Sequence, residues 1–280
     1  MASENQNSLF DVRGRVIAIT GALGALSGAA AEYFIAQGAK VAYLDLGMTR
    51  EKFEAVMARL REIDPCCEAV GLVANVLERA SLEAARDVIL QKWGRIDVLL
   101  NGAGGNMAGA TIPPEKTFFD LDFNAFEKVV DLNLHGTVLP SMVFGEVMTR
   151  QGKGVMINFS SVSADRALSR VVGYSAAKAA VMNFTRWLGV ELARKTNGGV
   201  RVNAVMPGFF IGEQNRSLLT NPDGSLTPRG NQIIGQTPFG RFGDAAELRG
   251  ALHFLISDAA GFITGVTVPV DGGFTAFSGV

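Results

Sequence analysis

The feature that most constrains this chain is a regular alternation of short apolar runs and longer segments with helical spacing. The short runs are apolar on both faces, as in strands that helices cover on both sides. We predict strands at 15–20, 40–46, 68–74, 96–101, 154–160, 200–206 and 265–270. We predict helices near 27–37, 49–62, 78–92, 123–150, 174–196 and 244–257. The pattern therefore predicts an α/β fold, a doubly wound parallel sheet of about seven strands with helices on both faces.

The chain has the length and apolar content of one large α/β domain rather than two small ones. Its 280 residues are 48% hydrophobic, which is enough to bury a full core. No internal repeat or linker divides the sequence, so we predict a single Rossmann-type domain over 1–280. One irregular stretch, 208–242, is rich in Gly, Pro, Asn and Thr. A loop of that length in a compact domain is usually functional, and we predict a substrate-binding loop or lid there.

Charge and the few metal-binding or reactive residues exclude several classes of function. The formal net charge is −1 with scattered basic residues, which leaves no footprint for nucleic acid or an anionic membrane. The polar N-terminus lacks a signal-peptide pattern, and no apolar run approaches the roughly 20 residues of a membrane span. His135 and His253 have no supporting cysteine or acidic cluster, so no metal site is predicted. We predict a cytoplasmic protein that acts on a small molecule.

The first predicted strand is followed by the glycine-rich turn TGALGALSG, residues 20–28, and then by a helix. A phosphate-binding loop needs small residues where the backbone touches a pyrophosphate, followed by a helix N-terminus that supplies N–H groups. The backbone of Gly21, Gly24, Ala25 and Leu26 is placed to meet that need. The glycine spacing fits neither G-x-G-x-x-G nor T-G-x-x-x-G-x-G, so a purely structural turn stays a close alternative.

Asp45 ends the second predicted strand, about 20 residues beyond this turn. A carboxylate there can accept hydrogen bonds from the adenosine ribose hydroxyls of a dinucleotide, and it would repel the extra 2′-phosphate of NADP. No Lys or Arg lies in the turn to offset this charge, although Arg50 is near. We therefore predict NAD as the cofactor, with NADP less favoured. The structural alternative is that Asp45 only caps the strand.

The third signal is YSAAK, in which Tyr174 and Lys178 share one face of a predicted helix. A nearby ammonium stabilises a phenolate and lowers a pKa of about 10, so Tyr174 becomes usable as a general acid and base. The run INFSS ends a strand and places Ser161 at the carboxyl edge of the sheet, where open α/β folds bind ligands. Alone, the Tyr–Lys pair fits an ordinary amphipathic helix equally well.

Together these motifs resemble the short-chain dehydrogenase/reductase (SDR) family, from about Val12 to Gly273. The shared marks are TG after the first strand, NGAG (101–104), DLNLHG (131–136), SS…YSAAK, RVNAVMPG (201–208) and VTVPVDGGF (266–274). The resemblance implies a dinucleotide-dependent oxidoreductase. Its implied catalytic tetrad is Asn133, Ser161, Tyr174 and Lys178.

The resemblance also implies a role for each member of the tetrad. Tyr174 would exchange a proton with the substrate oxygen while hydride passes to or from the nicotinamide, and Ser161 would hydrogen-bond and polarise that oxygen. Lys178 would hold the nicotinamide ribose and lower the pKa of Tyr174. Asn133 would anchor a water that links Lys178 to solvent. Singly, a helix-interior asparagine and a strand-end serine are also ordinary structural residues.

For the cofactor, the resemblance places the first turn and the NGAG segment along the dinucleotide. Val76 would lie against the adenine, and Asn75 stands where the family usually has aspartate. Pro207 and Gly208 would border the nicotinamide. Two further departures are Gly212, where a threonine is common, and Ser27, which replaces the last glycine of the turn. The predicted cofactor residues are Gly21, Gly24, Ala25, Leu26, Asp45, Asn75, Val76, Asn101, Gly102, Ala103, Gly104, Tyr174, Lys178, Pro207, Gly208 and Phe210.

Within the family, several stretches resemble the branch labelled D-mannonate oxidoreductase or fructuronate reductase, with gluconate 5-dehydrogenases nearby. They are NGAGGN, FFDLDF, PGFFIGEQNRSLL, TPFGRFG and VDGGFTAFSGV. That branch implies reversible oxidation of a sugar-acid hydroxyl, and a sugar acid needs a cation for its carboxylate and polar groups for its hydroxyls. The predicted substrate residues are Asn106, Arg166, Arg170, Gln214, Asn215 and Arg216. For each arginine, a surface or subunit-contact role is the structural alternative.

Other functions stay open on the sequence alone. The same tetrad would serve an SDR that acts on another polyol, gluconate, a steroid or a 3-oxoacyl group, and four phenylalanines at 118, 119, 209 and 210 favour an apolar ligand. The irregular glycine turn also fits a non-catalytic, NAD(H)-sensing protein, although the intact tetrad argues against it. The resemblance further implies a homotetramer whose subunits pair through the helices predicted at 123–150 and 174–196.

Overall fold

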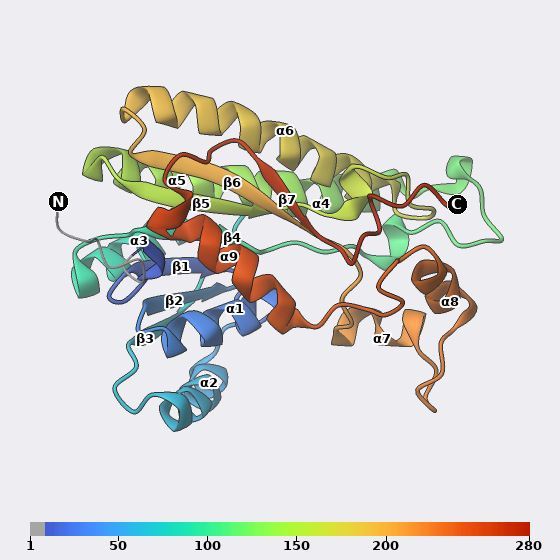
Figure 1. Ribbon diagram of the computed structural model, residues 1–280, viewed down its shortest axis with the longest axis horizontal. Coiled ribbons are helices and arrows are strands. Elements are labelled where there is room, and N and C mark those ends of the chain that lie inside the picture. The colour runs from blue at the N-terminus through green and yellow to red at the C-terminus, as the bar shows by residue number, and fades with distance from the viewer. Residues whose placement is uncertain (1–8) are drawn as a thin grey trace.

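The computed structural model describes residues 9–280, apart from the side chains of Ile63, Glu213 and Gln214. Within these residues, parallel strands form one sheet in the order β3-β2-β1-β4-β5-β6-β7 (Figure 1). The strands are β1 (Val16–Thr20), β2 (Lys40–Asp45), β3 (Ala69–Val73), β4 (Val98–Asn101), β5 (Gly154–Phe159), β6 (Val200–Pro207) and β7 (Thr267–Val270). Each lies within two residues of its predicted range, and the predicted doubly wound α/β fold is confirmed.

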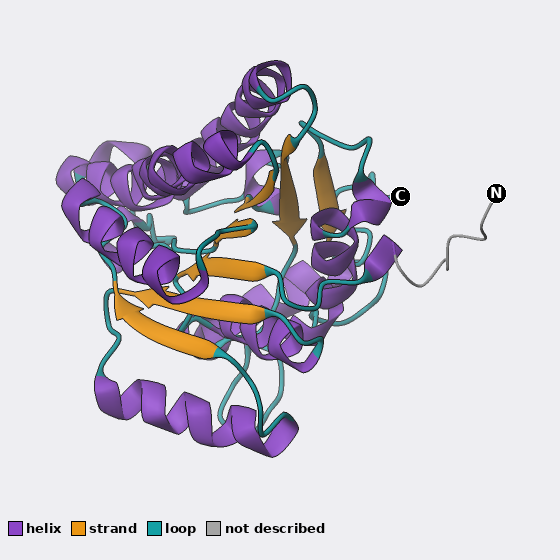
Figure 2. Ribbon diagram, turned by 90° about the vertical axis from the view of Figure 1, so that its left-hand side faces the viewer, coloured by secondary structure: helices purple, strands orange, loops and turns teal. Residues whose placement is uncertain are grey.

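Helices cover both faces of this sheet, which Figure 2 shows as one twisted layer between them. One face packs against α1 (Ala25–Ala36), α2 (Arg50–Ile63) and α9 (Leu248–Ile256). The other face packs against α3 (Arg79–Trp93), α5 (Gly136–Gln151) and α6 (Val172–Lys195). Because successive strand side chains point to opposite faces, Ile17 and Ile19 enter the first core while Val16 and Ala18 enter the second. Continuous apolar runs are therefore needed to build both cores.

The strand order reverses between β1 and β4, and this switch point positions the candidate site. Strands β2 and β3 lie on one side of β1, and the chain then crosses back to place β4 on the other side. Open α/β sheets bind ligands in the crevice at the carboxyl ends of such strands. Here the two strand ends are joined, because the Thr20 hydroxyl accepts hydrogen bonds from the N–H groups of Gly102 (3.1 Å) and Ala103 (3.2 Å).

The helix predicted over 123–150 is interrupted. It consists of α4 (Phe123–Val130), a π-turn η4 (Asp131–His135) and then α5. Within η4, Asn133 Nδ2 donates to the carbonyl of Val129 at 2.8 Å, and Asn133 Oδ1 accepts from the N–H of Gly105 at 3.1 Å. The buried amide thus bridges the carbonyl of Val129 in α4 and the loop after β4, and such π-turns often occur at functional sites.

The segment 208–242 contains more regular structure than expected. It includes α7 (Glu213–Leu219) and α8 (Pro228–Gly235), which lie beyond the carboxyl ends of β6 and β7 (Figure 1). Short 3₁₀ turns complete the fold at η2 (Ala108–Ala110), η3 (Phe118–Asp120), η5 (Val162–Ala164), η6 (Ala245–Glu247) and η7 (Asp258–Ala260). Among the described helices, none combines the length and the apolar character that a bilayer crossing requires.

Candidate active site

Tyr174 and Lys178 lie one turn apart on α6, next to the end of β5. Lys178 Nζ is 5.6 Å from the centre of the Tyr174 ring and donates to the carbonyl of Phe159 at 2.7 Å. The hydroxyl of Ser160 donates in turn to the carbonyl of Lys178 at 3.1 Å. These two bonds tie α6 to the strand, and they hold Lys178 inside the protein with 3% of its surface exposed.

Ser161 faces the same tyrosine from the turn that follows β5. Its hydroxyl accepts a hydrogen bond from the N–H of Ser163 at 3.2 Å, which caps the short turn η5 and fixes the serine side chain. The Ser161 side chain is also close enough to the Tyr174 hydroxyl to act on its pKa. The two hydroxyls therefore converge, as proton transfer to and from one substrate oxygen requires.

Burial controls the charge states of this pair. It raises the pKa of Tyr174 above its usual value, and the hydrogen bond from Ser161 opposes that rise. It lowers the pKa of Lys178 to about 8. In the chain by itself burial outweighs the opposing effect on the Tyr174 pKa, so the lowering that Lys178 would give stays a prediction. Both groups are desolvated, and the ammonium is directed to a backbone carbonyl rather than to the phenol oxygen.

Asn133 holds the loop after β4 against Lys178. Its amide nitrogen donates to the carbonyl of Gly105 at 2.7 Å, and its amide oxygen accepts from the N–H of the same residue. A Cβ on Gly104 would lie 2.7 Å from Asn133 Oδ1 and 3.2 Å from Lys178 Nζ. Only glycine fits between these two side chains, so Asn133 positions the 104–105 backbone beside the lysine.

The glycine-rich first turn is a close-fitting cradle. Gly21 has a left-handed φ of 64°, and a Cβ there would lie 2.7 Å from the Cα of Ala103. A Cβ on Gly24 would lie 3.1 Å from the carbonyl of Gly21. Helix α1 then begins at Ala25 with no side-chain cap and no acidic residue in its first turn. Its free N–H groups fit an anionic phosphate, so the turn is compatible with a dinucleotide.

Asp45 lies beside this turn, at the end of β2. Its carboxylate accepts from the N–H of Leu23 at 3.1 Å and from the N–H of Gly47 at 2.9 Å. The cation beside it is Lys52, whose Nζ donates to the carbonyl of Gly47 at 2.8 Å. Arg50 instead pairs with Glu54 along α2. Lys52 is not among the predicted cofactor residues; its only signal in the sequence is its position in the first turn of the helix after Asp45.

Three predicted cofactor residues direct their side chains away from the crevice. Asn101 is buried and donates to Ser141 Oγ (2.9 Å) and Asn158 Oδ1 (2.8 Å). The amide of Asn75 closes a local turn with the N–H of Leu77 and with Glu78. Phe210 is 9% exposed and belongs to the core, where its ring lies against Gly243. The side chains of Asn101 and Asn75 are thus engaged within the protein, whereas Val76 is buried next to Gly136, as a wall of the site would be.

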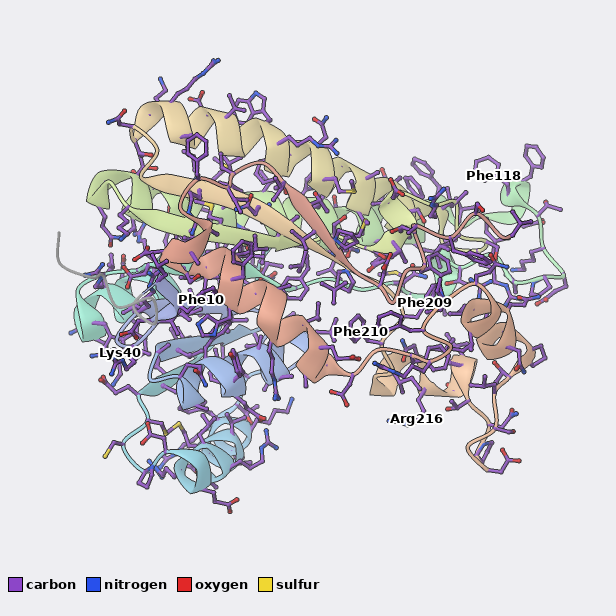
Figure 3. All side chains as sticks on the ribbon, in the orientation of Figure 1. Phe10, Lys40, Phe118, Phe209, Phe210 and Arg216 are labelled. Carbon is purple, nitrogen blue, oxygen red and sulfur yellow. The ribbon has the colours of Figure 1, made fainter. Side chains whose placement is uncertain are left out.

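The predicted substrate residues come from three segments. Arg166 donates to the carbonyl of Thr275 in the C-terminal segment. Asn106 donates to Thr111 Oγ1 at 2.9 Å. Asn215 is occupied within α7, because it bonds both the N–H of Gly212 and the carbonyl of Phe210 at 2.8 Å. Arg216 is exposed on α7, below Phe209 and Phe210 in Figure 3. The side chain of Gln214 lies outside the described residues.

The fold, the cradle of the first turn and the buried Tyr174–Lys178 pair place this chain in the class of Rossmann-type oxidoreductases. Residues 21–275 match the family described as enoyl-(acyl carrier protein) reductase. The chain is 42% identical over 279 residues to “Uncharacterized oxidoreductase UxuB” of Bacillus subtilis, covering 96% of this chain and 98% of that one. It is 34% identical over 269 residues to levodione reductase of Leifsonia aquatica, covering 94% of each.

A solved structure gives the same assignment. It is a protein of Haemophilus influenzae, provisionally named D-mannonate oxidoreductase, with bound NAD. The TM-score is 0.89 at 40% identity, over 99% of this chain and 100% of that one. This chain belongs to the short-chain dehydrogenase/reductase family, and it is an oxidoreductase that acts on alcohol or ketone groups. In the part of the chain that the structure describes, no three His, Cys, Asp or Glu side chains gather as a metal site.

Proposed function

We propose that the protein uses NAD to interconvert a secondary alcohol and a ketone of a sugar acid, with D-mannonate and D-fructuronate as the reference pair. The observation that carries this proposal is the convergence of Ser161, Tyr174 and Lys178 at the sheet edge, next to the loop that carries Arg170. Among the described side chains, Arg170 forms no ion pair. The provisional name of the Haemophilus influenzae protein and its bound NAD support the same function.

The chain's own residues fit the dinucleotide. The backbone of Gly21 and Gly24 and the first N–H groups of α1 would hold the pyrophosphate, and Asp45 would accept from the adenosine ribose. The negative charge of Asp45 favours NAD over NADP. When bound, the nicotinamide supplies or accepts the hydride. Lys178 would hold its ribose, in the space that Gly104 keeps open.

In the proposed reaction Tyr174 takes the hydroxyl proton during oxidation and returns it during reduction. Ser161 donates a hydrogen bond to the same substrate oxygen and favours the charged form of Tyr174. Protonated Lys178 stabilises the phenolate from below the ring. The proton route to solvent that the family resemblance assigns to Asn133 is part of this proposal.

We further propose that 208–242 closes over the substrate and that the protein is a cytoplasmic homotetramer. At the start of α7, a Cβ on Gly212 would lie 3.6 Å from the Cβ of Ala25, so α7 begins next to the glycine-rich turn that precedes α1. Met142 on α5 and Trp187 on α6 are 52% and 62% exposed and line an apolar groove between those helices. Burial of that groove between subunits would remove a large apolar surface from water.

The purified protein, NAD and a panel of substrates test the proposal by the absorbance of NADH. We expect D-mannonate, or another aldonate, to give a higher kcat/KM than neutral polyols such as D-mannitol. Turnover of only neutral polyols, steroids or 3-hydroxyacyl compounds would assign one of the alternative SDR functions. Tight binding of NADH without turnover of any compound would indicate a sensor.

A further inference from the structure

Two arginines from distant segments lie close together near the turn that carries Ser161. Arg170 lies in the loop between Ser161 and α6, and Arg229 lies in the first turn of α8. Arg229 Nη1 donates to Ser169 Oγ at 2.6 Å, and Arg229 Nη2 lies 3.5 Å from the carbonyl of Ser169. The guanidinium of Arg229 is therefore held on the residue next to Arg170.

The backbone of Arg170 is held in an unusual conformation. Its φ of 78° is in the left-handed region, which a residue with a long side chain rarely adopts. The carbonyl of Arg170 accepts from the N–H of Ile112 at 3.0 Å, which ties this loop to the segment after β4. Three segments thus meet at one arginine. Strained backbone of this kind persists where the surroundings enforce it, often at a ligand-binding site.

The positive charge at this point is not balanced by the protein. Among the described side chains, neither Arg170 nor Arg229 forms an ion pair, whereas Arg15, Arg59, Arg95 and Arg241 each contact a carboxylate. Burial and, to a smaller extent, the charge of Arg170 lower the pKa of Arg229, so the two cations repel each other. An anion between them would relieve that repulsion, and a carboxylate accepts two guanidinium groups well.

We propose that Arg170 and Arg229 together bind the carboxylate of the substrate. This inference rests on the proposed sugar-acid function and assigns the charge recognition to α8 of the 208–242 segment. Arg170 and Tyr174 are four positions apart in the chain, so their Cα atoms are at most about 14 Å apart, and a six-carbon acid with an extended arginine side chain spans that distance. Arg166 and Arg216 are left with structural or surface roles, because Arg166 bonds a backbone carbonyl and Arg216 is exposed on α7.

Steady-state kinetics test this role of the two arginines. The variants Arg229→Gln and Arg170→Gln are assayed with NAD and D-mannonate, or with whichever aldonate the wild type oxidises. We expect the KM for the sugar acid to rise by about 30-fold and kcat to fall by less than about threefold, since a lost charge-assisted bond weakens binding and leaves the reacting atoms in place. Arg229→Lys keeps the positive charge but lacks the paired N–H groups of the guanidinium, and it should raise KM by about fivefold. Arg59→Gln, which removes a surface arginine paired with Glu32, is the matched control.

Fluorescence titration with NADH checks that each variant retains a folded cofactor site. An unchanged KM in Arg229→Gln with intact NADH binding would overturn the inference. The contact with Ser169 would then be a purely structural hydrogen bond between α8 and the loop before α6. Should Arg229→Gln fail to bind NADH, Arg229→Lys decides, and a wild-type KM in that variant overturns the pair. A wild type that oxidises no sugar acid at all would instead overturn the proposed function, which is a different result.

Discussion

The side chain of Ser27 on α1 packs directly against the Cα of Gly102, so a Cβ on Gly102 would overlap Ser27 Oγ. Ser27 is 3% exposed, and it lies between the helix and the loop after β4. The serine that replaces the last glycine of the turn thus points into the protein. It does not widen the surface on which a pyrophosphate would lie.

This contact predicts that Ser27 affects stability more than cofactor binding. Ser27→Gly should leave the affinity for NADH within about threefold and lower the free energy of unfolding by about 1 kcal/mol, because a helical glycine costs backbone entropy. Gly102→Ala should cost about 1–3 kcal/mol through overpacking. In the double variant the two costs should not add, since the new Cβ then meets no serine. Urea unfolding measures all three, and strict additivity would contradict the contact.

The strands could be predicted from sequence because both faces of this sheet are buried. Every residue of β1 and β5 must then be apolar or internally bonded, and the resulting runs stand out from the surrounding helices. The position of the switch point between β1 and β4 came from the structure, because the apolar pattern does not specify strand order. Tyr174, Lys178 and Ser161 were brought together as predicted, since two share a helix face and the third ends the adjacent strand.

Side-chain direction could not be predicted, because it depends on partners far along the chain. Asn101 turns inward to reach Asn158, and Asn133 forms a π-turn to reach Gly105. Asn215 was predicted to meet substrate but closes the start of its own helix. Arg229 escaped notice for the same reason, because nothing in its local sequence shows that α8 brings it to Arg170.

Tyr174→Phe tests the proposed proton transfer with the smallest possible change. The substitution removes only the hydroxyl that Ser161 contacts and keeps the ring beside Lys178. We expect kcat to fall by about 1,000-fold or more, since a positioned general acid and base contributes on that scale. The Kd for NADH should stay within about threefold. Tyr43→Phe, which removes a buried hydroxyl in the core, is the matched control, and a similar loss of turnover there would contradict a specific role for Tyr174.

Lys178 predicts a pH dependence of stability in the ligand-free protein. Burial lowers its pKa to about 8, below its value in the unfolded chain of about 10.4. Between these values the unfolded chain binds more protons, so the contribution of Lys178 to stability grows as pH rises through this window and is lost as pH falls toward 8. Lys178→Met removes this dependence. Relative to wild type, the free energy of unfolding of this variant should therefore be larger at pH 7 than at pH 10 by about 2 kcal/mol, which means that the variant gains stability at the lower pH.

The Phe159 carbonyl accepts from an ammonium at pH 7 and from a neutral amine at pH 10, so the difference between the two pH values measures the buried charge together with this bond. Denaturant unfolding at pH 7 and pH 10 measures it, with Lys116→Met as the exposed control. Equal differences at the two pH values would show that the ammonium is not desolvated. The same variant should lose turnover, because Lys178 belongs to the proposed catalytic site. The lysine would thus be kept for catalysis although the ligand-free protein would be more stable without it.

The choice between NAD and NADP should depend on Asp45 and Lys52. Asp45→Ser removes the carboxylate that accepts from Leu23 and Gly47, so NADH binding should weaken by about tenfold. Lys52 lies beside Gly47 and remains to meet a 2′-phosphate, so NADPH binding should strengthen by about tenfold. Adding Lys52→Gln should abolish that gain, whereas Asp64→Ser, at the far end of α2, should change neither Kd. Fluorescence titrations with both cofactors decide. If Asp45→Ser gains no affinity for NADPH, the carboxylate does not set the preference, because removing its repulsion should leave Lys52 free to act on the 2′-phosphate.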